Sequence, residues 1–234
     1  MIRTLELANF LYRLFYVLGF VTIFVFNGFY SKKYNIKPAK SVVFSILSYI
    51  LIFAWAYVLA WVENGFEWGH HNAIRVYIWM PLIIFVMSKL FSIEWSRAID
   101  YIAPSTCIVY GIARIGCLFT GCCYGIRCEW GIFSTIASYN VFPVQLCEAI
   151  TSLAIAYWCI YNNRKHNYNS HGYTYPTMLV LYGYSRFIWE FLADNTKILF
   201  GVISSLAIWA FATGTIGVIW LLILKLRNKI ASQT

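Results

Sequence analysis

Two arginines, Arg114 and Arg186, lie in or at the edge of apolar stretches of the sequence that are long enough to span a bilayer. A charged side chain near the bilayer centre costs about 2.5–3.5 kcal/mol on insertion scales, so a charge kept there calls for a reason. The guanidinium group binds phosphate through paired, planar donors, and does so better than the ammonium group of lysine. The two arginines therefore indicate a phosphate site, and the phosphate available in a membrane is a phospholipid headgroup.

Carboxylates accompany these arginines. Glu190 follows Arg186 by four residues, which places both on one helix face, with Tyr182 one turn earlier. Glu148 lies in a third apolar stretch. One interpretation is an ion pair that neutralises itself inside the protein. The other is that the two guanidiniums open toward one cavity and, with one or two carboxylates to balance them, leave room for an anion.

A glycine- and cysteine-rich segment, about residues 113–142, begins next to Arg114. Gly116, Gly121 and Gly125 allow non-helical backbone and a close approach of N–H groups to a ligand. Irregular backbone at membrane depth is tolerated only against protein or a water-filled cavity. We therefore expect this segment to form the floor of a polar pocket at the outer side of the membrane.

Four of the seven cysteines lie in the same segment, and three roles are open to them. They would be small packing residues, a disulfide that pins the loop on an oxidising side of the membrane, or a metal or thiol site. Their spacing lacks the C-x2-C of ordinary zinc sites, and no histidine is interleaved. From the sequence we assign no metal site and no cofactor. The four are Cys117, Cys122, Cys123 and Cys128.

Membrane helices must position these side chains. The chain has 234 residues, of which 61% are hydrophobic and 12% charged, and a soluble domain of this size cannot hide that much apolar surface. The sequence predicts a single transmembrane domain, residues 1–234, of the all-α polytopic class. The apolar runs predict about seven transmembrane helices, at residues 8–30, 41–62, 76–92, 100–120, 143–161, 174–193 and 199–224.

The basic residues predict the orientation. Eleven of the 18 fall in alternate connecting segments and after the last apolar run, and the positive-inside rule assigns those segments to the cytoplasm. We therefore place the N-terminus outside and the C-terminus in the cytoplasm. The same pattern accounts for the net charge of +9 without a nucleic-acid partner. The eleven are Lys32, Lys33, Lys37, Lys40, Lys89, Arg97, Arg164, Lys165, Lys225, Arg227 and Lys229.

Several motifs in one order resemble the prolipoprotein diacylglyceryl transferase family. GIARIGCLFTGCCYG, residues 111–125, resembles the family signature GRIGNFINGE-x-x-G. FPVQLCEA, residues 142–149, is similar to HPSQLYEA, and YGYSRFIWEF, residues 182–191, is similar to YG-x-x-RFIVEFFR. AIDYIAPS at 98–105 and FLYRLFYVLGF at 10–20 resemble further family segments. The resemblance spans most of the chain and implies the same seven-helix fold.

This resemblance implies a multi-pass enzyme of the bacterial inner membrane that transfers diacylglycerol from phosphatidylglycerol to the lipobox cysteine of a prolipoprotein. The expected partners are that phospholipid and a lipobox-containing protein. By position, Arg114 and Arg186 match the two phosphate-binding arginines of the family, and Glu190 matches the carboxylate one turn later. The other expected site residues are Tyr12, Gly116, Cys117, Gly121, Gly125, Gln145 and Glu148.

The chain departs from the family at the HGGLIG motif, which should fall on residues 74–79 and has neither histidine nor glycine there. His71, a turn upstream, is the candidate substitute, so the proton acceptor is expected to be His71 or Glu190. The alternative is a non-catalytic phospholipid-binding relative that has lost the catalytic histidine, which is favoured if Tyr77 and Trp79 fill the space between the arginines. A transporter, a third interpretation, is weakened by the lack of internal repeats.

Overall fold

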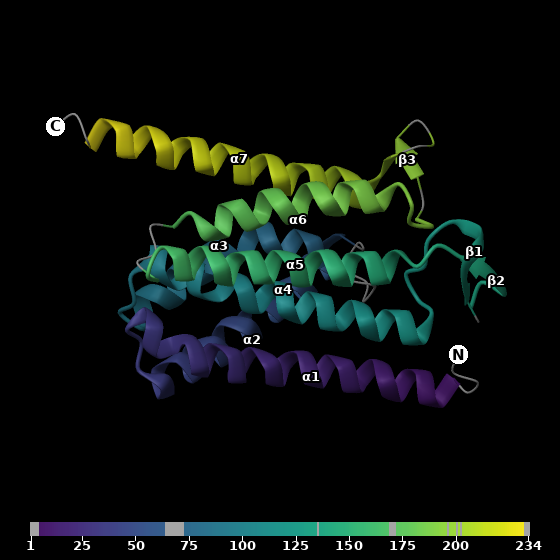
Figure 1. The fold of residues 1–234 in the computed structure, drawn as a ribbon, viewed down its shortest axis with the longest axis horizontal. Helices are drawn as coiled ribbons and strands as arrows, with labels where there is room; N and C mark the ends of the chain where they lie inside the picture. The colour runs from purple at the N-terminus through teal and green to yellow at the C-terminus, as the bar shows by residue number, and fades with distance from the viewer. Residues whose placement is uncertain are drawn as a thin grey trace.

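A computed structural model describes residues 5–63, 73–134, 136–168, 172–195, 197–199, 201 and 203–231. Within these ranges the chain forms seven α-helices, and Figure 1 shows most of them running side by side along one axis. The helices are α1 (Leu5–Ser31), α2 (Pro38–Glu63), α3 (Ala73–Leu90), α4 (Trp95–Thr120), α5 (Val144–Lys165), α6 (Thr174–Glu190) and α7 (Ser205–Ala231), with a short 3-10 helix η1 (Lys32–Tyr34) after α1.

The predicted helical segments are confirmed, with some ends shifted by several residues. Five of the helices, α1, α2, α4, α5 and α7, are long and apolar enough to cross a membrane. The other two are shorter: the apolar part of α3 is Val76–Leu90, and α6 has 17 residues. At 1.5 Å per residue α6 is about 26 Å long, slightly less than a hydrocarbon core of about 30 Å. The chain is thus a largely helical polytopic membrane protein, while seven spans and their orientation stay predictions.

Two hairpins of short strands lie between the helices, and the sequence analysis predicted neither of them. β1 (Arg127–Ser134) pairs antiparallel with β2 (Tyr139–Val141), and β3 (Lys197–Leu199) pairs antiparallel with β4 (Ile203–Ser204). The second hairpin takes residues that we assigned to the last helix, so α7 begins at Ser205. Both hairpins lie at the end of the bundle that carries the N-terminus, here called the hairpin end (Figure 1). Strand pairing gives hydrogen-bond partners to the backbone N–H and C=O groups of these segments, which lie outside the helices.

The surface of the bundle is apolar and its interior holds polar groups. Phe29, Leu90 and Tyr157 expose 71%, 72% and 72% of their surface, and many other apolar side chains are exposed along the helices. Inside, the Tyr101 hydroxyl donates to the Asn27 carbonyl over 2.6 Å. An apolar surface around polar interior groups is unfavourable in water. It suits a lipid solvent, in which backbone and side-chain polar groups must find partners within the protein.

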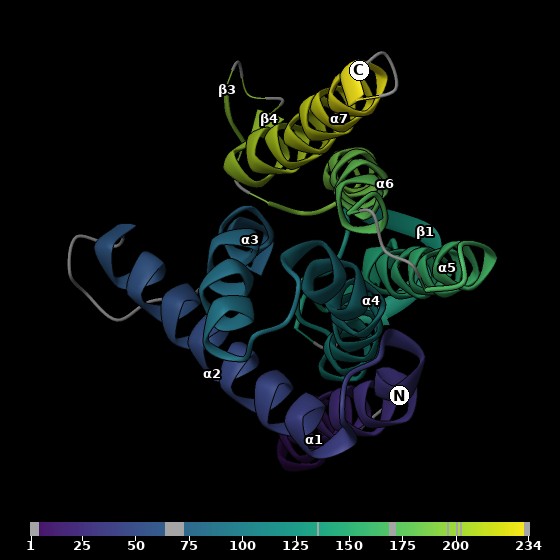
Figure 2. The ribbon, with the colours of Figure 1, turned by 90° about the vertical axis from the view of Figure 1, so that its left-hand side faces the viewer.

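Helix α4 occupies the centre of the bundle in the end-on view of Figure 2, where α1, α3, α5 and α6 surround it. α2 contacts α1 and α3, and α7 packs mainly on α6. At the hairpin end α4 ends, α5 begins and α6 ends. The ends of α4, α5 and α6 that carry the predicted site residues therefore lie near one another.

The close approach of α6 to α7 depends on a glycine, which gives a first prediction. A Cβ added to Gly183 would lie 2.3 Å from the backbone nitrogen of Gly214, so the two helices would have to move apart. We expect Gly183→Ala to lower the free energy of unfolding by about 1–3 kcal/mol. Gly28→Ala is the matched control, because its Cβ meets only a Val42 methyl group at 3.8 Å. Unfolding in detergent micelles measures both, and equal stability of the two variants would contradict the prediction.

Candidate active site at the hairpin end

Three helices bring two arginines and two glutamates together. Glu148 of α5 lies between Arg114 of α4 and Arg186 of α6. The Arg114 Nε is 2.5 Å from Glu148 Oε2, and Arg186 pairs with Glu148 Oε1 through Nη1. Arg186 Nη2 lies 2.8 Å from Glu190 Oε2, the pair expected from the four-residue spacing. The sequence predicted that the arginines share one region, and in the structure they share one carboxylate.

This geometry favours the first of the two interpretations, an ion pair that neutralises itself inside the protein, and corrects the other, an anion site between the arginines. The Glu148 carboxylate occupies that place, and with Glu190 it balances the two guanidiniums in formal charge. The physical reason is burial: the side chains of Glu148 and Arg186 are only 3% and 8% exposed, and a buried charge without a partner is costly. Arg114 is the most open member of the four, with 15% of its side chain exposed. Among the described residues its ion pair uses Nε alone.

Two tyrosines support this cluster. The Tyr110 hydroxyl, one turn before Arg114, accepts from Arg114 Nε over 2.8 Å and donates to Glu148 Oε2 over 3.2 Å. Its ring meets that of Tyr182 edge to face, with centroids 5.2 Å apart. The sequence analysis noted Tyr182 on the Arg186 face but missed Tyr110. Its position four residues before Arg114 was the available signal.

Glu190 is the most enclosed member of the cluster. Besides Arg186, it accepts a hydrogen bond from the Ser204 hydroxyl over 2.8 Å, and Asn195 Nδ2 lies 2.5 Å from the same Oε1 atom. Its side chain is 0% exposed. A carboxylate so enclosed is suited to holding Arg186 in place, whereas a general base needs access to the proton that it accepts.

The expected glycines and Gln145 support the backbone of the loop after α4. Gly121, with φ 74°, ends the helix and donates to the carbonyls of Cys117 and Leu118. Gly125 donates to the Phe142 carbonyl over 3.0 Å. Gln145 Nε2 donates to the Cys122 carbonyl over 2.7 Å. We expected these glycine N–H groups to face a ligand; instead both form hydrogen bonds within the protein, because the loop must satisfy its own backbone.

The remaining expected residues lie around this cluster or outside the described residues. The Tyr12 ring packs on Tyr16 with centroids 4.9 Å apart. A Cβ on Gly116 would lie 3.0 Å from the Phe15 Cβ, so Gly116 is where α1 crosses α4. Cys117, one residue on, is buried. His71 lies outside the described residues, and nothing follows for its role.

An apolar cavity of about 100 Å³ opens beside the charged cluster. It lies between α1, α2, α3 and α4, and Tyr16, Tyr77 and Tyr110 line it. Tyr77 is buried, and its ring stacks on that of Tyr182 with centroids 4.3 Å apart. Trp79 is 39% exposed, and its ring packs edge to face against that of Trp55. A smaller cavity of about 10 Å³, room for about one water molecule, is lined by Arg186, Glu148 and Tyr182, among others. A polar cluster that adjoins an apolar cavity suits a ligand with a charged head and a hydrocarbon tail.

The loop after α4 places the Cys123 thiol near Arg114 of this cluster. Hydrogen bonds from the thiols of Cys117 and Cys122, together with the nearby charge of Arg114, hold the pKa of the Cys123 thiol well below its ordinary value. The thiolate is the nucleophilic and metal-binding form of cysteine. The four cysteines that the sequence analysis named are free thiols in the structure, which leaves no disulfide among them.

The family described as prolipoprotein diacylglyceryl transferase matches residues 2–224 of the chain. A phosphatidylglycerol–prolipoprotein diacylglyceryl transferase of Clostridium tetani (strain Massachusetts / E88) is 27% identical over 108 residues, 43% of this chain and 43% of that protein. A phosphatidylglycerol–prolipoprotein diacylglyceryl transferase 2 of Clostridium perfringens (strain 13 / Type A) is 26% identical over 113 residues, 45% of this chain and 43% of that protein. The match thus spans less than half the length of these curated relatives.

Proposed function

The chain belongs to the prolipoprotein diacylglyceryl transferase family, and from that membership we propose that it transfers diacylglycerol from phosphatidylglycerol to a cysteine thiol of a prolipoprotein. We propose further that it does so in the bacterial inner membrane, with the hairpin end facing outward. The observation that carries the proposal is the convergence of Arg114 and Arg186 on Glu148 beside an apolar cavity. That arrangement has the chemistry of a phospholipid site.

In the proposed reaction the acceptor sulfur attacks the carbon of the diacylglycerol unit that is bonded to the phosphate oxygen. A C–S bond forms, the C–O bond breaks, and glycerol phosphate leaves with the electron pair. Negative charge grows on the leaving phosphate, and fixed guanidinium donors near it lower the barrier. The thiol proton passes to a base, for which His71 stays the candidate, because Glu148 and Glu190 are both held by guanidiniums.

The roles of the four charged residues follow from their exposure. Because Glu148 fills the space between the arginines, the proposed phosphate position moves to the open side of Arg114, whose Nη groups are free of carboxylates among the described residues. Glu148 and Glu190 hold the guanidiniums in fixed positions before the lipid arrives. Such preorganisation avoids the cost of reorienting the charges during the reaction.

One observation favours the alternative of a phospholipid-binding protein without catalysis. In the segment where the family has its histidine motif, this chain has a buried Tyr77 stacked on Tyr182, next to the charged cluster. A tyrosine there adds an aromatic wall to the cavity but no base that works near neutral pH. Binding without turnover is the result that this alternative predicts.

The test combines binding and turnover on the full chain. Protein in nanodiscs is supplied with phosphatidylglycerol labelled in its glycerol headgroup and with a lipobox peptide. Mass spectrometry of the peptide reports the thioether, and the label reports released glycerol phosphate. We expect both products from the native chain. Binding alone would support the non-catalytic alternative, and a failure of both would contradict the proposed function.

Arg114→Gln tests the phosphate position. Loss of a charge-assisted contact costs about 1.5–3 kcal/mol, so binding of phosphatidylglycerol should weaken by roughly 10–100-fold. Arg97→Gln is the matched control, because Arg97 is 33% exposed and pairs with Glu94 at the opposite end of the bundle. Lipid titration by intrinsic fluorescence measures both. Equal affinities in the two variants would show that the phosphate lies elsewhere.

A further inference from the structure

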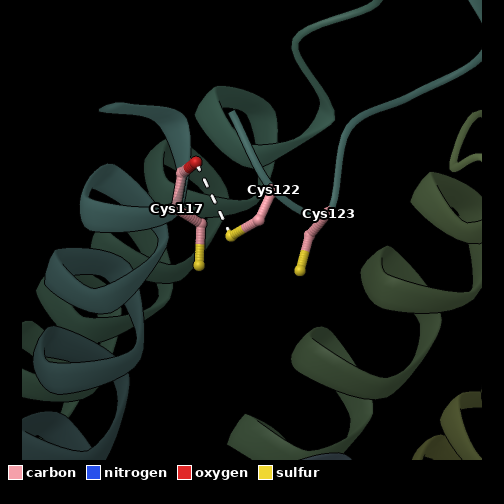
Figure 3. Close-up of side chains that lie close together, drawn as sticks. All are labelled: Cys117, Cys122 and Cys123. Atoms are coloured by element: carbon pink, nitrogen blue, oxygen red, sulfur yellow. Dashed lines mark hydrogen bonds between the residues drawn. The ribbon is translucent and has the colours of Figure 1, made fainter. Parts of the chain in front are cut away.

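Three thiols gather where α4 ends. The Sγ atoms of Cys117, Cys122 and Cys123 all lie within 4.8 Å of one another, and all three cysteines are free. Figure 3 shows the three side chains pointing into the same space beside the helix end. The spacing of the cysteines along the chain did not predict that these thiols meet. Cys117 lies in the last turn of α4, whereas Cys122 and Cys123 follow the point at which the chain reverses.

The backbone is shaped to bring these thiols together. Helix α4 ends at Thr120, and Gly121 turns the chain back with φ 74°. Cys123 also has a positive φ, of 55°, a backbone conformation that residues other than glycine rarely adopt. Gln145 of α5 holds the Cys122 carbonyl from the other side. A strained residue that is held in place by its neighbours is a feature typical of functional sites.

The three roles left open by the sequence can now be compared. Packing does not explain Cys123, which is exposed and gains nothing in burial from its strained backbone. A disulfide joins two sulfurs and would leave the third thiol of a close trio unpaired. A metal ion uses all three thiols and accounts for their convergence on one point.

The size of the trio fits a metal ion. Thiolate sulfurs bind such ions at about 2.3 Å, so three sulfurs around one ion lie ~4 Å apart, which small side-chain rotations reach from the observed distances. Thiolates select soft ions such as Cu(I) and Zn(II). Arg114, one turn before Cys117, places a positive charge near the negative charge that three thiolates would bring.

We propose that Cys117, Cys122 and Cys123 form a site for one soft d10 metal ion, Cu(I) or Zn(II). Cu(I) is held by the three sulfurs alone, and Zn(II) takes a water as its fourth ligand. Binding displaces the thiol protons to solvent and changes no oxidation state. The site does not depend on the proposed lipid transfer, so either can fail without the other.

The test loads reduced, purified full-length chain anaerobically with Cu(I) or Zn(II) in separate arms. Excess metal is removed by desalting in the presence of a competing chelator, and elemental analysis gives the metal content. We expect about one ion per chain, with sulfur as the dominant scatterer in X-ray absorption. Replacing any one of the three cysteines by serine should weaken binding by more than the 10–100-fold that loss of an outer hydrogen-bonding partner costs.

Cys128→Ser is the matched control, because Cys128 follows the trio closely along the chain, in strand β1, but lies outside it. Gel filtration and thermal unfolding establish that each variant is folded before its metal content is compared. Retention of the metal ion by the native chain and by Cys128→Ser, but not by the single variants of the trio, supports the site. Equal retention by a triple-serine variant, no retention by the native chain, or a disulfide within the trio when thiols are trapped in intact membranes would overturn it.

Discussion

Glu148→Gln should lower the free energy of unfolding by about 3–5 kcal/mol, because it removes the carboxylate that two buried guanidiniums share. Glutamine has nearly the same shape, so little packing is lost with the charge. Arg114 would then have no carboxylate among the described residues, and Arg186 would keep only Glu190. A charge left buried without its partner is what makes this change costly.

Unfolding in mixed micelles measures the effect, with Glu94→Gln as the matched control. Glu94 is 62% exposed and pairs with Arg97 on the surface, so its loss should cost less than about 1 kcal/mol. Adding Arg114→Met to the Glu148→Gln chain should recover part of the lost stability, because it removes one of the unpaired charges. Additive losses in the double variant would show that these two residues do not interact as the structure indicates.

Arg186→Lys should lower the rate of diacylglyceryl transfer by about 100-fold, because Glu148 would lose the partner that fixes it against Arg114, the proposed phosphate-binding residue, and a small displacement of a catalytic group costs a rate factor of this size. Arg186 uses Nη1 for Glu148 and Nη2 for Glu190, and one ammonium group cannot reproduce that planar geometry. The charge is kept, so the experiment separates the geometry of the donor from its charge.

The rate is measured with saturating phosphatidylglycerol, and lipid binding is measured separately. Arg97→Lys serves as the control at the opposite end of the bundle, where we expect no change. A small loss of binding with a large loss of rate would show that Arg186 acts by positioning Glu148 and Arg114 for the reaction. An Arg186→Lys chain as active as the native one would contradict this positioning role.

Local features of the sequence were enough to predict the helices. Long apolar runs fix where lipid-exposed helices form, because backbone in hydrocarbon must satisfy its hydrogen bonds within the segment. The pair of Arg186 and Glu190 was likewise visible, since four residues make one helical turn. The family motifs carried the assignment of Arg114, Arg186 and Glu148 to one site.

The hairpins were not predictable in the same way. β1 and β2 follow no clear alternation of apolar and polar residues, and β1 is mostly exposed. Their pairing depends on where α4 ends and where α5 begins, which the local sequence pattern sets only to within several residues. The sequence therefore indicated an irregular segment at 113–142 but not its strands.

The sequence by itself determined the membrane class, the helical segments and the residue types of the charged cluster, because these follow from composition and from contacts within one helix. Only the tertiary structure decided that Glu148 stands between the two arginines, since this depends on how α4, α5 and α6 are rotated against one another. It also decided that three thiols meet, because the two positive φ angles at Gly121 and Cys123 reverse the chain in a way that no spacing of cysteines reveals.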